Sequence, residues 1–335
     1  MFSPTQRSLW TPAAPHIWAI NATGSAAEDY VSVIRTLLDQ PRWLEAQYLY
    51  DEHGSHLFEE ICELPEYYLT RTENSILAEC ADQVISAAPV ECIVELGSGT
   101  SKKTAHLLRQ QIKQRGRGIF APIDVSLSSL EASRDLISEE FPELTFNGLC
   151  ARYEEGMSGV DKTVPKLFVF LGSTIGNFNR SEFSIFFRRL SQSMGPKDFL
   201  LLGVDRVKDT PLLEKAYDDS RGVTAEFILN VFRHVNRRLG SDFDRAKMRY
   251  HSWYNPQWQQ IEMYAISTAA QEIHFPSFDT SFVWEENDRI LVEISRKFEP
   301  RRLQSQLQFF GLKSVGHFTD PREWFSVLLF RKSQI

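Results

Sequence analysis

Short apolar runs alternate with amphipathic stretches through the middle of the chain. Runs rich in β-branched residues predict buried strands, and segments with apolar residues three or four positions apart predict helices. Strands are expected at 92–96, 118–124, 144–149, 167–171 and 199–204, with helices at about 103–114, 128–139 and 180–193. Because strand and helix alternate, we predict a doubly wound α/β domain with a mostly parallel sheet and helices on both faces.

The pattern changes on both sides of this region. Before it, helices are expected near 26–38, 55–62 and 71–86, and Thr70 and Glu73 have the spacing of a capping box at the start of the last one. After it, 210–239 is predicted helical and 250–267, 281–298 and 309–330 strand-like. Residues 1–20 lack periodicity and are expected to form a loosely attached arm. We therefore predict one domain of 72–206 plus 297–335, and an α+β lobe of 1–71 plus 207–296.

Composition and charge narrow the class of protein. The 335 residues are 42% hydrophobic and 24% charged, values that are typical of globular proteins. With a net charge of −7, the chain does not have the excess of basic residues that is typical of nucleic-acid binders, and it is poorly suited to binding anionic membrane surfaces. The longest apolar runs, such as 199–204, are too short to span a bilayer, and residues 1–13 show no signal-peptide pattern. We expect a cytoplasmic protein.

The four cysteines give no sign of a metal or redox site. They are widely spaced and include no C-x-x-C pair: Cys62, Cys80, Cys92 and Cys150. Reduced thiols are the expected state in a cytosolic protein, and we predict no metal site.

A glycine turn and an acid indicate a nucleoside-binding crevice. Gly97 and Gly99 follow the first strand, where glycine lets the backbone approach a ligand closely, and Asp124 ends the second strand, where an acid can accept hydrogen bonds from ribose hydroxyls. Alone, the first feature could be an ordinary turn and the second a solvated loop residue. The third glycine of the dinucleotide fingerprint and the Walker lysine motif are both missing, so S-adenosylmethionine (AdoMet) is favoured over a nicotinamide cofactor.

Long, unusual sequence strings then carry a family resemblance. They lie at 50–61, 64–68, 70–73, 94–104, 170–178, 216–220 with 222–225 and 230–231, and 293–298. In this order they resemble the AdoMet-dependent histidine Nα-methyltransferases of ergothioneine biosynthesis, which form hercynine. The resemblance implies a methyltransferase-type sheet in the first domain, which would bind AdoMet, and a substrate-binding role for the α+β lobe.

The resemblance also implies individual cofactor contacts. Gly97, Lys103 and Asp124 match positions that contact AdoMet, and Asp124 would hold the ribose. Arg152 and Tyr153 match the adenine-facing pair, where the family has an acid followed by an aromatic residue. Because arginine cannot accept a hydrogen bond from the adenine amino group, either backbone groups do so or these two assignments are wrong.

Six further positions match substrate contacts of the family: Tyr67, Asn177, Tyr217, Met263, Glu293 and Ser295. The resemblance implies that the two tyrosines and Asn177 hold the α-amino and carboxylate groups, and phenol and amide groups suit that task. Glu293 and Ser295 would bond the imidazole, and their i, i+2 spacing directs both side chains to one face of a strand. Met263 would line the side-chain pocket.

The chemistry and its alternatives follow from these assignments. Methyl transfer needs a neutral amine held in line, so we predict no dedicated acid–base residue, and the resemblance implies three successive transfers to L-histidine. Another aromatic amino acid, such as tryptophan or a derivative, is the alternative substrate, and a non-catalytic AdoMet-binding module is the alternative function. The oligomeric state stays open, with a monomer possible.

Overall fold

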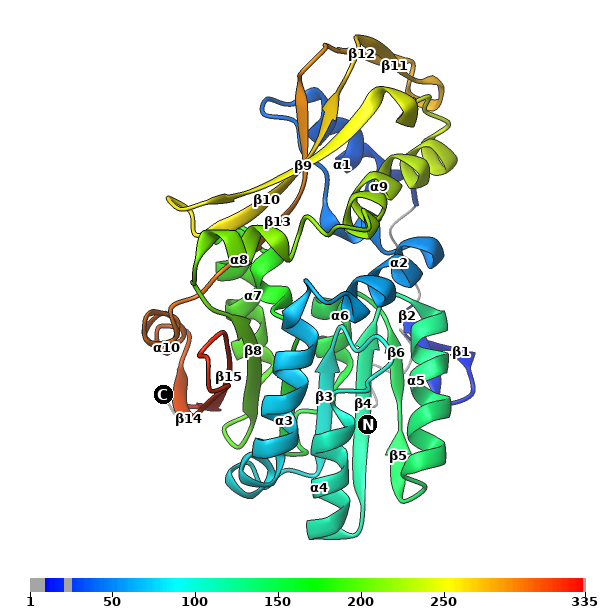
Figure 1. The fold of residues 1–335 in the computed structure, drawn as a ribbon. Coiled ribbons are helices and arrows are strands. Elements are labelled where there is room, and N and C mark those ends of the chain that lie inside the picture. The colour runs from blue at the N-terminus through cyan, green and yellow to red at the C-terminus, as the bar shows by residue number, and fades with distance from the viewer. Residues whose placement is uncertain (1–9, 21–25, 334–335) are drawn as a thin grey trace. The chain divides into compact units, whose positions relative to one another are not determined.

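The computed structural model describes residues 10–20 and 26–333, which form two compact units. Unit 1 comprises Met1–Asn21, Leu69–Val207 and Phe298–Ile335, and unit 2 comprises Ala22–Tyr68 and Lys208–Lys297. In each unit, segments that are far apart in the sequence are neighbours in space (Figure 1).

Unit 1 is built on one large sheet, in which the described residues contribute ten strands. Its spatial order is β1 (Trp10–Ala14), β2 (Ile17–Ile20), β6 (Gly148–Cys150), β4 (Gly118–Asp124), β3 (Cys92–Leu96), β7 (Lys166–Phe170), β8 (Phe199–Asp205), β15 (Phe325–Lys332) and β14 (Leu312–Thr319), with β5 (Leu144–Phe146) paired to β4. The pairs from β2 to β8 are parallel, and β15 is antiparallel to both of its neighbours. The predicted doubly wound, mostly parallel sheet is confirmed.

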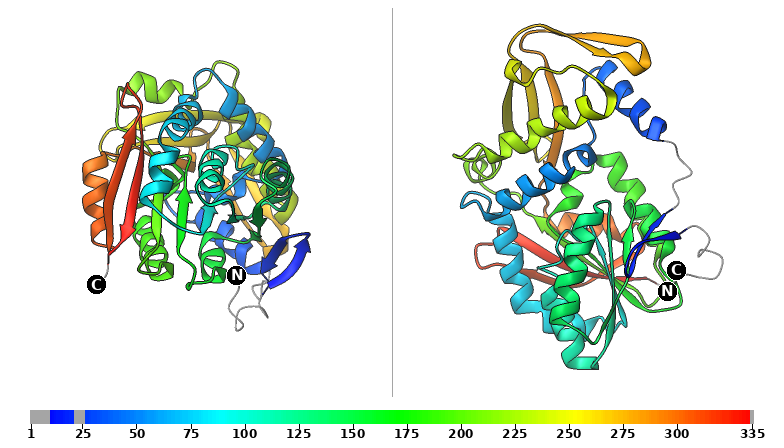
Figure 2. Two further views of the ribbon diagram at one scale, coloured as in Figure 1. Left: turned by 90° about the horizontal axis from the view of Figure 1, so that it is seen from below. Right: turned by 90° about the vertical axis from the view of Figure 1, so that its right-hand side faces the viewer.

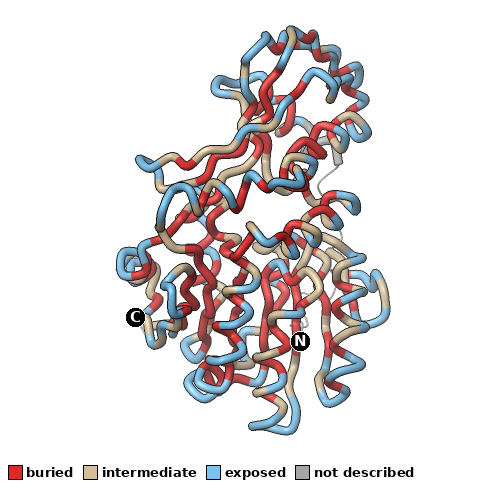
Figure 3. The backbone as a smooth tube through the Cα atoms, viewed as in Figure 1, coloured by how far each residue is buried: buried red, intermediate tan, exposed pale blue. Residues whose placement is uncertain are grey.

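Helices cover both faces of this sheet (Figures 1 and 2). One face carries α3 (Tyr68–Ala87), α4 (Ala105–Arg115) and α5 (Leu127–Glu140), and the other carries α6 (Tyr153–Gly159), α7 (Arg180–Ser193) and α10 (Pro300–Gln308). On the second face, Phe187 of α7 packs in one buried cluster with Phe168 and Leu200 of the central strands. The central strands are buried along their length (Figure 3), which explains their uninterrupted apolar runs.

The N-terminal segment differs from its prediction. Residues 10–20 form the antiparallel pair β1–β2, and β2 extends the large sheet by pairing in parallel with β6. Trp10 and Ile17 are buried there, so burial of apolar side chains holds this segment in unit 1. The predicted loose arm within the substrate lobe is wrong for residues 10–20, and residues 1–9 lie outside the described part of the chain.

Three local predictions also need correction. The strand expected at 144–149 is two short strands, β5 and β6, which are separated at Asn147 and both pair in parallel with β4. The capping box is wrong, since α3 begins at Tyr68 and Thr70 lies inside it. The helix expected at 210–239 is broken into α8 (Thr210–Lys215) and α9 (Val223–Leu239), with Gly222 at a φ of 72° before α9.

Unit 2 combines helices with two small antiparallel sheets. Its other helices are α1 (Ala26–Leu38) and α2 (Glu52–Glu63), its larger sheet has the order β13 (Arg289–Arg296), β10 (Gln260–Ser267), β9 (Met248–Asn255), and β11 (Gln271–Phe275) pairs with β12 (Thr280–Trp284). Helix α9 contacts all three strands of the larger sheet and also α2. Short 3-10 turns complete the described chain: η2 (Ala46–Leu49), η3 (Thr174–Asn177), η4 (Arg245–Lys247) and η5 (Pro276–Phe278).

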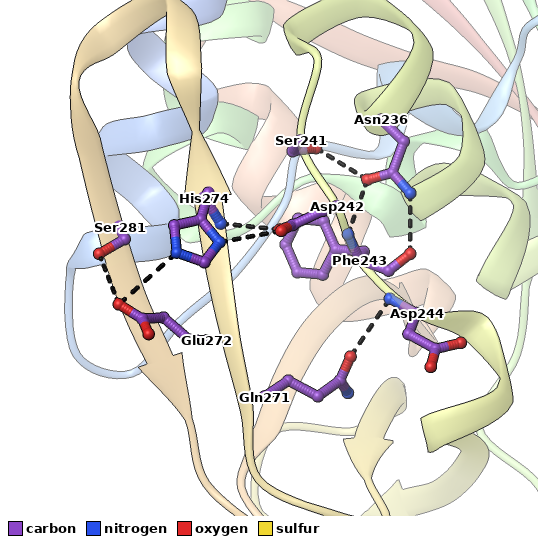
Figure 4. Close-up of polar contacts among 9 residues, drawn as sticks. All are labelled: Asn236, Ser241, Asp242, Phe243, Asp244, Gln271, Glu272, His274 and Ser281. Atoms are coloured by element: carbon purple, nitrogen blue, oxygen red, sulfur yellow. Dashed lines mark hydrogen bonds and ion pairs between the residues drawn. The ribbon is translucent and has the colours of Figure 1, made fainter.

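A polar network fixes the β11–β12 hairpin to the segment after α9 (Figure 4). Asp242 accepts hydrogen bonds from the backbone N–H of His274 at 2.8 Å and from its Nδ1 at 2.9 Å. Asn236 Oδ1 accepts from the backbone N–H of Phe243 at 3.0 Å, and the Phe243 ring then packs against Trp284. The hairpin is therefore held by satisfied hydrogen bonds as well as by aromatic packing.

The helices and the cysteines of the structure bear on the expectations about membrane spans and disulfides. No helix among residues 10–20 and 26–333 is long and apolar enough to cross a membrane. All four cysteines are free thiols.

Candidate functional site

The glycine turn of unit 1 has the backbone conformation that its sequence suggested. Gly97 and Gly99 follow β3 with φ values of 68° and 48°, in the left-handed region that favours glycine. A Cβ placed on Gly97 would lie 2.9 Å from the Tyr153 hydroxyl oxygen. Two of the predicted cofactor residues, Gly97 and Tyr153, are thus brought together at the carboxyl end of β3.

Asp124 lies beside this turn, at the carboxyl end of β4. One carboxylate oxygen accepts a hydrogen bond from the Gly99 N–H at 3.0 Å, and the other accepts from the Ser126 N–H at 2.9 Å. Burial raises the pKa of Asp124, and the backbone N–H groups act in the opposite direction. Each oxygen keeps a second lone pair, so the carboxylate is held rigidly and can still accept from ribose hydroxyls.

Lys103 is held by a buried acid, Glu73, which the sequence reasoning assigned only to a capping box. Its Nζ pairs with the carboxylate of Glu73, which is fully buried on α3. The same carboxylate accepts from the Gly172 N–H, with oxygen distances of 2.8 and 2.9 Å. Glu73 therefore joins α3, the turn after β3 and the turn after β7. No local pattern could reveal it, because its partners lie 30 and 99 residues away.

Glu95 is a second acid that sequence reasoning missed. It lies on β3, is 3% exposed, and one carboxylate oxygen bonds the Thr104 hydroxyl. Burial raises its pKa to about 7. Among the described residues, eight buried side-chain polar atoms lack a hydrogen-bond partner, and two of them, Glu95 Oε2 and Ser98 Oγ, lie close together in the sequence at the end of β3. Buried polar atoms are rarely left unpaired, so these two atoms point to a polar ligand.

The donor set of this end of the sheet fits AdoMet. Glu95 and Ser98 can bond an amino group, Lys103 can bond a carboxylate, and Asp124 can bond ribose hydroxyls. AdoMet carries all three groups. These groups lie at the carboxyl ends of the adjacent parallel strands β3 and β4 and in the segment that follows β3, which is where open α/β sheets bind ligands.

The two residues predicted to face the adenine, Arg152 and Tyr153, differ in how exposed their side chains are. The Tyr153 ring is half-buried and packs edge-on against Phe170, with 5.3 Å between ring centroids, and burial raises the pKa of its hydroxyl. Arg152 is exposed at the start of α6, where its backbone N–H donates to Glu155 at 3.2 Å. The assignment of both residues to adenine stays a prediction.

Five of the six predicted substrate residues belong to unit 2, and each of the five contacts or pairs with another of them. Met263 of β10 is the register partner of Glu293 of β13, so both side chains lie on one face of the sheet. The Tyr217 hydroxyl bonds Ser295 Oγ at 2.8 Å, and the Tyr217 ring lies edge-on to the ring of Tyr67, 5.9 Å away. The sixth residue, Asn177, ends η3 in unit 1.

The environment of these residues is largely shielded from water. Burial raises the pKa of Glu293 to about 8, and the charge of Lys297 acts in the opposite direction. Burial also raises the pKa of Tyr67 well above its usual value. Lys297, another residue that sequence reasoning missed, is 3% exposed and donates to both the Tyr217 and the Ser295 hydroxyls. Its only sequence signal is the continued alternation of Glu293, Ser295 and Lys297.

Neither set of residues has the composition of a metal centre. Among the described residues, no three His, Cys, Asp or Glu side chains come together in a way that could hold a metal ion. The available groups are carboxylates, hydroxyls, an amide and two ammonium groups, which bind polar organic molecules through hydrogen bonds.

Comparison with known proteins gives a consistent result. The family described as "Histidine-specific methyltransferase, SAM-dependent" matches residues 28–332. Histidine N-alpha-methyltransferase of Mycolicibacterium smegmatis is 38% identical over 92% of this chain and 96% of its own. The protein of the same name from Mycobacterium tuberculosis is 38% identical over 87% of this chain and 91% of its own. Ergothioneine biosynthesis protein 1 of Neurospora crassa is 32% identical over 85% of this chain and 33% of its own.

Proposed function

Because the chain belongs to the family of histidine-specific, SAM-dependent methyltransferases, we propose that it transfers three methyl groups from AdoMet to the α-amino nitrogen of L-histidine. The product is hercynine, for ergothioneine biosynthesis. The proposal is carried by one observation: a chain of this family has a desolvated carboxylate and hydroxyl, Glu293 and Ser295, on one strand face. These two groups suit the two ring nitrogens of imidazole.

In this proposal, unit 1 holds the cofactor and unit 2 holds the side chain of the substrate. AdoMet supplies an electrophilic methyl group. Glu95, Lys103 and Asp124 fix its polar groups, and the turn at Gly97 leaves room for its close approach. Tyr153 packs beside the adenine, and Arg152 contributes backbone groups only, because its side chain cannot accept from the adenine amino group.

The α-amino group must be neutral to attack, since an ammonium has no lone pair. Tyr67, Tyr217 and Asn177 are uncharged, so they can bind a neutral amine and the carboxylate without stabilising the ammonium. Shielding from water favours the neutral amine in the same way. No dedicated acid–base residue is required, and catalysis comes mainly from holding the amine in line. We also propose that the reaction takes place in the cytoplasm, where both AdoMet and free histidine are available.

The experiment that tests this function is product analysis by mass spectrometry. Purified protein is incubated with AdoMet and an equimolar mixture of the standard amino acids. The proposal requires histidine to gain up to three methyl groups. Methylation of tryptophan or another amino acid would retain the cofactor but refute the roles of Glu293 and Ser295. AdoMet binding with no methylated product would favour a non-catalytic module.

A further inference from the structure

A buried lysine lies next to the proposed imidazole-binding groups. Lys297 follows β13 directly and continues the alternation of Glu293 and Ser295, so the three side chains share one face of the chain. Its side chain is 3% exposed. An ammonium removed from water is costly unless hydrogen bonds replace its hydration, so the contacts of Lys297 need an explanation.

Those contacts include a triangle of polar atoms. Lys297 Nζ lies 2.7 Å from the Tyr217 hydroxyl oxygen and 2.9 Å from Ser295 Oγ, and the two oxygens are 2.8 Å apart. An ammonium only donates, so both oxygens accept from Lys297. The bond between the oxygens uses one of the two hydroxyl hydrogens. When Tyr217 donates to Ser295, the Ser295 hydroxyl hydrogen is left to reach an acceptor outside the triangle.

We propose that Lys297 is a positioning residue that makes the Tyr217–Ser295 pair a hydrogen-bond donor and thereby selects the neutral imidazole of histidine. The lone-pair nitrogen of the ring would accept from this pair, and the ring N–H would be donated to Glu293. An imidazolium has no lone pair and would be repelled by the buried ammonium. An indole also has no lone-pair nitrogen, so the same pair would disfavour tryptophan. The inference rests on the proposed function.

The tyrosines near Glu293 do not change the expected pH dependence of histidine binding. Glu293 interacts electrostatically with Tyr67, Tyr250 and Lys297. Burial raises the pKa of Tyr67 and Tyr250, so both stay neutral at ordinary pH. Between pH 5 and 8, Glu293 and the ligand ring titrate.

The first test compares two ligands on the wild-type protein loaded with S-adenosylhomocysteine. Calorimetry measures the Kd of L-histidine and of β-(1,2,4-triazol-3-yl)-L-alanine, whose ring stays neutral at pH 5.5. Titration of Glu293 affects both ligands, so their Kd ratio isolates the ring. Because the neutral fraction of imidazole falls roughly tenfold from pH 7.5 to 5.5, the ratio should rise about tenfold. A ratio that does not change with pH would overturn the proposal.

The second test asks whether Lys297 acts through the two hydroxyls. Lys297→Met should raise the KM for histidine about tenfold, which corresponds to the loss of one hydrogen bond to a charged group. The Kd of AdoMet should stay within about twofold of the wild-type value. The exposed Lys247→Met serves as the matched control in unit 2. In a Tyr217→Phe, Ser295→Ala background, Lys297→Met should add less than about a threefold loss.

The outcomes separate the two proposals. Fully additive losses, or equal weakening of AdoMet and histidine, would show that Lys297 is merely structural. If Lys297→Met does not fold, the ligand comparison on the wild-type protein still decides. Absence of any methylated histidine from the wild-type protein would refute the proposed function, whereas normal activity with a pH-independent Kd ratio would refute only the role of Lys297.

Discussion

Glu73 offers the sharpest test of how unit 1 prepares its cofactor site. Its buried carboxylate pairs with Lys103 and accepts from the Gly172 N–H at 2.8 Å. Gly203 lies so close that a Cβ there would overlap with the carboxylate. The side chain therefore has no alternative position, and Glu73→Gln changes its charge with almost no change in volume.

The magnitude follows from these contacts. The amide oxygen of glutamine can still accept from Gly172, so the change removes mainly the charge that faces Lys103. Hydrogen bonds to charged groups contribute about 1.5–3 kcal/mol. Because the Lys103 side chain is 24% exposed and can be partly solvated, we expect a loss in the lower half of that range, about 2 kcal/mol. At about 2–4 °C per kcal/mol, the Tm should fall by about 4–8 °C.

Two assays check this prediction. Thermal unfolding gives the change in Tm, and calorimetry gives the Kd of AdoMet, which should weaken because Lys103 is no longer held in place. Glu79→Gln is the control, since Glu79 is exposed on the same helix. A Glu73→Gln variant with the Tm and the AdoMet affinity of the control would refute the reasoning that Glu73 positions Lys103.

Further predictions concern other residues of the two units. Asp124→Ala should weaken AdoMet binding far more than histidine use, and Glu293→Ala should do the reverse; equal losses in either variant, by calorimetry and kinetics, would contradict separate roles. Gly97→Ala should weaken AdoMet at least tenfold by calorimetry through its contact with Tyr153, whereas Gly116→Ala, with a similar φ and no neighbour within 4 Å, should not. The pKa of Glu293 is 4.5 in the unfolded chain and about 8 in the folded protein, so the free energy of unfolding, measured in urea, should fall as the pH rises from 4.5 to about 8. The fall should be smaller in the Glu293→Gln variant. Identical pH profiles of the unfolding free energy for the two proteins would refute the raised pKa.

The central part of the fold was predictable because burial on two faces leaves a clear pattern. Strand β4 and helix α7 have the bounds that the sequence predicts, since apolar runs and periodic segments alternate there without interruption. Strands β2, β5 and β6 are only three or four residues long, and pairing with segments elsewhere in the chain stabilises them. Such pairing is not encoded locally, so the attachment of residues 10–20 to the sheet could not be foreseen.

Some residues of the candidate site were likewise predictable from the sequence, and others were not. Gly97, Gly99 and Asp124 were predictable from their places at strand ends, where the chain itself requires a turn. Glu73 and Lys297 were not, because each acquires its role from partners far along the chain, such as Gly172 for Glu73. The family resemblance supplied the substrate residues, and it could not supply residues that act through them.

A buried charged side chain indicates a ligand site more selectively than the glycine turn does, provided that one checks whether hydrogen bonds within the chain already satisfy it. Lys166 and Asp198 are also buried, but they pair with each other at 3.1 Å, and Asp198 accepts from the N–H groups of Lys166 and Gly195. Both oxygens of Asp198 therefore have partners within the chain and need no ligand. Glu95 has the same burial and keeps one oxygen without a partner among the described residues. Because an unpaired buried oxygen costs about 1–3 kcal/mol, its persistence at the end of a central strand favours a role in binding rather than in folding.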